Sequence, residues 1–150
     1  MKFQPNTYSK QIVFSLVVML TTLQIAYSQS RTRDISQEKL AWNSDQATEQ
    51  RSSSAMSYSC SFKTDGRQSV VWIQKNGQRT TTFTVRGTEG SWTDVSQPGS
   101  FTWLLTYDGR IGKMTAVKNE SDTYIILDFS ESGEHAVHQK FRVHSVQPYN

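Results

Sequence analysis

The fold is decided by residues 101–117, which read FTWLLTYDGRIGKMTAV. The Asp108-Gly109 pair favours a mirror-image two-residue turn, whose twist matches that of two antiparallel strands. Such a turn fixes every residue pair across the hairpin. The predicted pairs are Tyr107–Arg110, Leu105–Gly112, Trp103–Met114 and Phe101–Ala116. Most large apolar side chains of the hairpin then lie on one face.

Two later turns extend this face. A turn at Asn119–Asp122 and a loop of Ser132-Gly133-Glu134 would join strands near 110–118, 123–130 and 135–146. The resulting pairs are Ala116–Ile125, Met114–Leu127, Gly112–Phe129, Phe129–Val137 and Ile125–Phe141. The three turns, placed independently, predict one continuous apolar wall. It consists of Phe101, Trp103, Leu105, Met114, Ala116, Ile125, Leu127, Phe129, Val137, Phe141 and Val143.

An upstream stretch is framed by Asp65-Gly66 and Asn76-Gly77, and it predicts strands near 57–64, 67–75 and 78–86. Two-residue turns would place one apolar set on one face, namely Tyr58, Cys60, Phe62, Val71 and Ile73. The other face would carry Val70, Trp72, Phe83 and Val85. Both faces of the 70–73 strand are thus apolar, so we expect both to be covered. A further short strand is predicted near 91–95.

Consecutive hairpins with one apolar wall predict an all-β, antiparallel up-and-down meander of about eight strands. Closure into a small barrel, or strong curling of the sheet, would remove the exposed edges of such a meander. A sandwich would need a long crossover, which only the segment 87–99 could supply. The sequence therefore favours the barrel.

The first 28 residues are typical of a signal peptide. Lys2 and Lys10 precede an apolar run from Ile12 to Ala26, and Ala26-Tyr27-Ser28 supplies small residues at the cleavage positions. Polar residues shorten this run below the length of a confident membrane span. We expect a secreted or periplasmic protein with no stable span after cleavage. Residues 29–56 then form a polar arm or linker with a possible short helix at 34–42, and residues 57–150 form the β domain.

Charge and cysteine content narrow the function classes. Loss of Lys2 and Lys10 with the signal leaves 14 basic against 13 acidic residues, a net charge of +1, so the sequence gives no support for nucleic-acid binding. Cys60 is the single cysteine, which excludes an internal disulfide. A small buried side chain is the favoured role of Cys60, and a reactive thiol or intermolecular bridge is the alternative.

No enzyme motif stands out, so we predict a non-enzymatic protein without cofactor or metal. His135 and His138 would point to opposite faces of a strand and could not chelate together. Catalysis would need two of the four candidates to meet inside a pocket: His135, His138, Asp128 and Asp94. Asn119-Glu120-Ser121 is an acceptor for N-glycosylation if the source is eukaryotic.

Two functions are open. The first is an exported binding protein for a small, mostly apolar ligand held by the inward wall. Its candidate contacts are Trp103, Leu105, Met114, Leu127, Phe129 and Phe141. The alternative is a protein-interaction module, such as an envelope subunit or inhibitor, that uses an exposed β edge. Its candidate contacts are Val70, Trp72, Thr81 and Phe83.

Trp92 is expected to plug a barrel end or cover a sheet edge. An alternative role for this tryptophan is a sugar-binding platform shared with Trp42 and Tyr107. The sequence leaves the oligomeric state open.

Overall fold

The computed structural model describes residues 34–49, 54–129 and 137–150. The expectations for the signal peptide, residues 29–33, the Ser132–Glu134 loop and His135 lie outside this part of the chain. The order of elements is η1 (Ile35–Gln37), β1 (Lys39–Glu49), β2 (Ala55–Asp65), β3 (Ser69–Gln74), η2 (Lys75–Gly77), β4 (Arg79–Glu89), β5 (Gly99–Tyr107), β6 (Arg110–Lys118), β7 (Thr123–Phe129) and β8 (Val137–Pro148).

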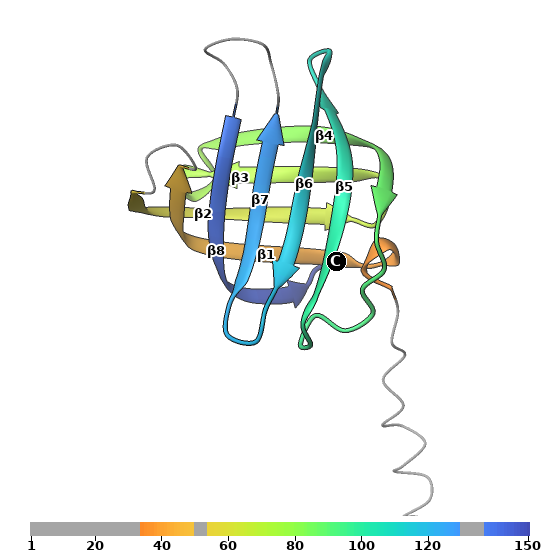
Figure 1. The fold of residues 1–150 in the computed structure, drawn as a ribbon. Helices are drawn as coiled ribbons and strands as arrows, with labels where there is room; N and C mark the ends of the chain where they lie inside the picture. Colours follow the sequence, from red (N-terminus) through yellow and green to blue (C-terminus); the bar gives the residue numbers. More distant parts are fainter. Residues whose placement is uncertain (1–33, 50–53, 130–136) are drawn as a thin grey trace, which may run out of the picture. The chain divides into compact units, whose positions relative to one another are not determined.

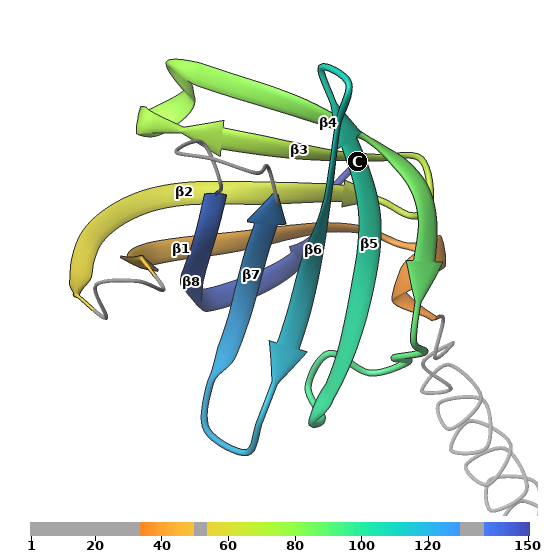
Figure 2. The same cartoon turned by 45° about the horizontal axis from the view of Figure 1, so that its top comes forward.

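The eight strands form a closed antiparallel barrel, as the meander predicts (Figures 1 and 2). In Figure 1, β5–β8 run upright in front and β1–β4 cross behind them. Closure is made by β8, in which residues 137–143 pair with β7 and residues 139–148 pair with β1. Each described strand therefore has a neighbour on both sides, although residues 55–59 of β2 pair with β1 alone.

The register of β5–β8 is confirmed. Asp108 and Gly109 have positive φ, as a mirror-image turn requires, and Trp103 lies opposite Met114. Ala116 faces Ile125, and Ile125 faces Phe141 across the next two strand pairs. Every member of the predicted wall is buried except Val137, which is half-buried.

The register of β2 and β3 differs from the prediction. Phe62 lies opposite Trp72 rather than Ser69, because the connection is a three-residue loop, Gly66 to Gln68. The pairing partner changes by an odd number of residues, which moves the side chains of β3 to the opposite face of the sheet. Val70 and Trp72 therefore join Phe62 on the inner face, while Val71 points outward.

Contacts with residues distant in sequence explain why the β2–β3 loop has three residues rather than two. Gly66 has φ 51°, its N–H donates to the Glu38 carbonyl at 3.1 Å, and its own carbonyl accepts from Trp103 Nε1 at 3.0 Å. The loop is thus held by distant parts of the barrel. By contrast, the β3–β4 register agrees with the prediction, with Ile73 opposite Thr80.

The first strand lies where the sequence predicted an arm or short helix. Residues 39–49 form β1, and only the single turn η1 is helical, capped by Asp34 Oδ1, which accepts from the Ser36 N–H at 2.9 Å. A register shift between Ser44 and Gln46 interrupts the alternation of β1. Ser44 Oγ donates to the Gln46 carbonyl at 3.0 Å and holds this irregularity. The predicted strand near 91–95 is wrong, since β4 ends at Glu89 and β5 begins at Gly99.

One end of the barrel is covered by η1 and the 90–98 loop. The Ile35 N–H donates to the Trp92 carbonyl at 3.0 Å, and the Trp92 ring packs on Trp42 with centroids 6.0 Å apart. Trp92 Nε1 donates to the Gln97 carbonyl, which folds the loop onto its own ring. Trp92 is 4% exposed. The prediction that it plugs a barrel end is confirmed.

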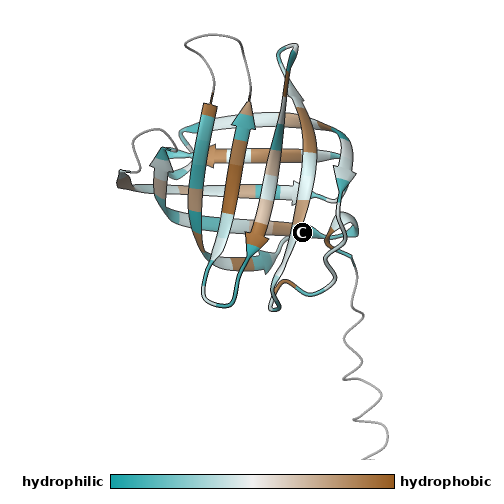
Figure 3. Cartoon of the chain, in the orientation of Figure 1, coloured by the Kyte–Doolittle hydropathy of each residue, from teal (hydrophilic) through white to brown (hydrophobic). Residues whose placement is uncertain are grey.

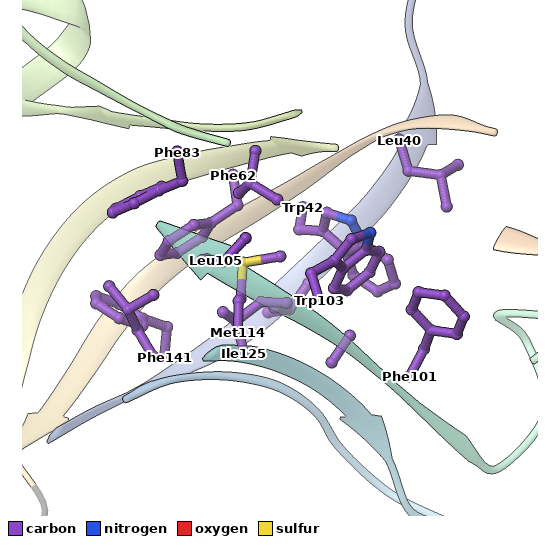
Figure 4. Close-up of a cluster of buried hydrophobic side chains, with 14 of the residues drawn as sticks. Leu40, Trp42, Phe62, Phe83, Phe101, Trp103, Leu105, Met114, Ile125 and Phe141 are labelled. Atoms are coloured by element: carbon purple, nitrogen blue, oxygen red, sulfur yellow. The ribbon is translucent and has the colours of Figure 1, made fainter. Parts of the chain in front are cut away.

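Aromatic side chains fill the centre of the barrel (Figure 4). Trp103 contacts Phe101 at 4.7 Å and Trp42 at 6.3 Å between ring centroids. Farther along, Phe62 packs edge-on against Phe141 at 5.0 Å. Hydrophobic and hydrophilic residues are interspersed along the strands around this core, and β7 carries a continuous hydrophobic run (Figure 3). The interior is packed toward η1, so the space for a ligand has to be sought at the opposite end.

Candidate functional site

The opposite end, which we call the mouth, is where β3, β5 and β7 end and β4, β6 and β8 begin. A cavity of about 150 Å³ lies there. Its lining consists of Trp72, Arg79, Thr81, Phe83, Tyr107, Arg110, Leu127, Phe129 and Val137. Concave, mostly apolar spaces with a few polar groups are typical of small-molecule sites.

The tight turns position this lining. Tyr107 and Arg110 flank Asp108-Gly109 and pair directly across the β5–β6 hairpin. Arg79, Thr81 and Phe83 lie on alternate positions of β4, so they share the inner face. The cavity is therefore built from strand residues on fixed hydrogen-bonded ladders.

Rings form the walls and floor of the cavity. Phe83 packs on Phe129 with centroids 5.3 Å apart and meets Tyr107 at 5.6 Å. Trp72 stacks on Phe62 at 5.5 Å with 9° between the planes. These contacts hold the rings in place, so a bound apolar group would meet preformed surfaces.

The cavity unites residues that the sequence assigned to two different functions. Leu127 and Phe129 from the predicted ligand wall line it. The other four wall residues, Trp103, Leu105, Met114 and Phe141, are fully buried in the packed core and are not part of its lining. Trp72, Thr81 and Phe83, expected at a partner edge, face the same cavity, and Val70 is buried in the core. The register shift of β3 explains why residues expected on an edge face inward.

Sequence reasoning missed Arg79, Tyr107, Arg110 and Val137 as members of one site. A usable signal was present. Arg110 directly follows the predicted Asp108-Gly109 turn, and Arg79 lies two residues after the predicted Asn76-Gly77 turn. Alternation from Phe83 and from Met114 places both arginines on inward positions. Charged residues at inward positions next to two turns indicate a polar rim around an apolar interior.

A wider groove of about 460 Å³ lies elsewhere, lined by residues that include Asn43, Cys60, Asn76 and His144. It is more open to solvent and has no Phe, Trp or Tyr in its lining. We therefore regard the smaller mouth cavity as the better ligand site, since ligand sites are lined mostly by hydrophobic and aromatic side chains.

Cys60 is buried on the inner face of β2 and is the one free thiol of the described residues. Burial raises the pKa of the Cys60 thiol to about 11, although the Trp72 and Ser44 side chains oppose this rise. A neutral, buried thiol agrees with the packing role and disfavours the reactive one.

The Cys60 thiol is expected to react slowly with a chromogenic aromatic disulfide at pH 8. A pKa of about 11 instead of 9.0 lowers the thiolate fraction on the order of 100-fold. The rate should rise with pH up to about 11 and increase by a similar factor in denaturant. The Cys60→Ser variant, which has no thiol, gives the background rate. Equal rates for folded and denatured protein would contradict this assignment.

Two of the candidate catalytic residues, His138 and Asp128, contact each other outside the mouth cavity and the groove. His138 Nδ1 and Asp128 Oδ1 are 3.0 Å apart as a cross-strand pair, and both belong to the face opposite the wall. Neither lines the mouth cavity or the groove. Asp94 lies in the 90–98 loop at the other end and accepts from the Ser96 N–H. The absence of enzymatic activity stays a prediction.

The remaining sequence candidates have local roles. Trp42 and Trp92 lie at the covered end and Tyr107 at the mouth, so the three cannot form one sugar platform. Asn119 lies in the β6–β7 turn, where its Oδ1 accepts from the N–H groups of Ser121 and Asp122. It is exposed, and its glycosylation stays a prediction.

Within the described ranges, no group of three or more His, Cys, Asp or Glu side chains is arranged to hold a metal ion. The same residues contain no helix with the length and apolarity needed to cross a membrane. No family model, curated protein or solved structure matches the chain.

Proposed function

We propose that this chain is an exported, non-enzymatic binding protein that holds a small, mostly apolar ligand in the mouth of its barrel. The observation that carries the proposal is the aromatic cavity of about 150 Å³ at the end opposite η1. A cavity of about this volume with an apolar lining accommodates a benzene-sized molecule. Because the centre of the barrel is packed, the ligand is a single ring or a short branched chain.

The buried side chains of the lining favour binding inside the cavity over adsorption to the protein surface. Phe83, Leu127 and Phe129 are at most 6% exposed, and all three line the cavity. An apolar group placed against them would bury its own surface without displacing a packed side chain. Each buried CH₂ contributes about 0.8 kcal/mol to such binding.

Toluene is the probe that tests the proposal. We expect it to shift the amide NMR signals of Thr81, Phe83, Leu127 and Phe129 in the full chain. Thr81→Phe should weaken toluene binding at least tenfold, because the larger ring occupies the cavity. Thr80→Phe is the matched control on the exposed face of the same strand and should leave binding unchanged. Shifts scattered over the surface, or equal in both variants, would refute the mouth as the site.

A further inference from the structure

The rim of the mouth cavity carries positive charge. Arg79 and Arg110 both belong to its lining, and among the described residues no Asp or Glu side chain does. Asp108 lies in the exposed β5–β6 turn outside the lining, and Asp128 is paired with His138. A bound molecule would therefore meet the Arg79 guanidinium above an aromatic floor.

Two buried donors lie on the inner face of β3, beside this rim. Gln74 is only 4% exposed, yet its Nε2 has no hydrogen-bond partner among the described residues, and the same holds for Trp72 Nε1. The Cys60 sulfur, a weak acceptor, is within reach of the Trp72 ring nitrogen. A buried donor without an acceptor costs about 1–3 kcal/mol. The Gln74 amide therefore makes the β3–β4 side the polar side of the site.

Arg79 connects the cavity with these donors. It pairs with Gln74 directly across β3 and β4. Tyr58 Oη donates to Gln74 Oε1 at 2.7 Å and so turns the Gln74 NH₂ group away from itself. The Gln74 amide, hydrogen-bonded to this phenol, thus lies on the strand directly beside Arg79.

We infer that the ligand is a small carboxylic acid with a single-ring or branched apolar body, bound as its carboxylate. The apolar body lies against Phe83, Leu127 and Phe129. The carboxylate lies at the β3–β4 side of the rim, where Arg79 supplies the charge. This inference rests on the proposed function and adds the class of ligand to it. Arg79 presents a planar fork of donors that matches a carboxylate.

A matched pair of probes tests the charge requirement. Phenylacetate and phenylacetamide have nearly the same shape and differ in charge, so their affinities for the full chain isolate the anionic group. We expect phenylacetate to bind at least tenfold more tightly at low ionic strength, with the preference decreasing as salt screens the exposed guanidinium. Titrations followed by amide NMR report both the affinity and the place of binding.

Two arginine variants separate a specific contact from net charge. Arg79→Gln should abolish the preference for phenylacetate, while toluene still binds. Arg86→Gln removes the same charge from an exposed position on β4 that does not line the cavity, and it should keep the preference. Urea unfolding of both variants checks that each is folded.

The outcomes distinguish this inference from the proposed function. Equal affinity for phenylacetate and phenylacetamide, or equal effects of the two arginine variants, would refute anion recognition while leaving toluene binding intact. Failure of toluene and of both phenyl probes to shift the mouth signals would refute the proposed function as well.

Discussion

Trp42→Ala is expected to lower the free energy of unfolding by about 3–5 kcal/mol, the usual cost of removing a fully buried large aromatic side chain. Trp42 is 0% exposed and contacts both Trp92 and Trp103. Its Nε1 donates to Thr64 Oγ1 at 3.2 Å, and this hydroxyl donates in turn to the Leu40 carbonyl. The substitution leaves a cavity at the end where η1 and the 90–98 loop meet. Urea unfolding followed by circular dichroism measures the loss.

The control for Trp42 lies on the same strand. Asp45→Ala removes an exposed side chain at the β1 irregularity and should change stability by less than about 0.5 kcal/mol. The comparison tests the role of β1 itself. If residues 39–49 were a loosely docked arm, the two variants would unfold at similar urea concentrations. A large difference is expected only if β1 is an integral strand that closes the barrel between β2 and β8.

The sequence predicts β5–β8 almost completely because local signals agree there. Asp108-Gly109 sets the first register, and the turns that follow place most of the large apolar side chains, Met114 and Ile125 among them, on one face. In β1 the same alternation is broken by the shift at Ser44, and Ser44 is a buried polar residue. The sequence of residues 39–49 therefore looks like a polar segment, although these residues form β1, which pairs with β8 where the barrel closes.

The β2–β3 register could not be predicted from local turn chemistry. Asp65-Gly66 is a strong two-residue turn signal, but the structure uses Gly66 as a contact for Trp103 and Glu38. Those partners are distant in sequence, so no local rule identifies them. The consequence reaches the candidate site, because the shift turns Trp72 from an expected outer face into the mouth cavity.

The candidate site was partly predictable. An inward apolar wall followed from the alternation, and Leu127 and Phe129 were correctly placed on it. The position of the free space was not predictable, because it depends on how the rings pack. Phe62, Trp72 and Phe141 meet one another and fill the middle of the barrel. The cavity begins only where this packing ends.

Gly112→Val is expected to lower the free energy of unfolding by about 3 kcal/mol, because overpacking forces neighbouring groups to move. A Cβ at Gly112 would lie 2.5 Å from Cγ and Cδ1 of the Phe129 ring and 2.6 Å from the Asp128 carbonyl oxygen. The ring can rotate, but the carbonyl belongs to the β7 backbone that pairs with β6. Lys113→Ala, at the next and exposed position, is the control and should be nearly neutral.

The displaced ring links this stability effect to the mouth. Phe129 lies over Gly112 and also lines the cavity, so a side chain at position 112 pushes the ring toward the ligand space. Toluene binding should weaken in Gly112→Val even where the protein is fully folded. In a Phe129→Ala background, Gly112→Val should lower the free energy of unfolding by less than it does in the wild type. The difference between the two costs is the coupling energy, which is about 0.5–3 kcal/mol for residues in contact. Additive costs in this double-mutant cycle would show that the Phe129 ring does not cover Gly112. Some cost should persist in that background, because the contact with the Asp128 carbonyl does not depend on the ring.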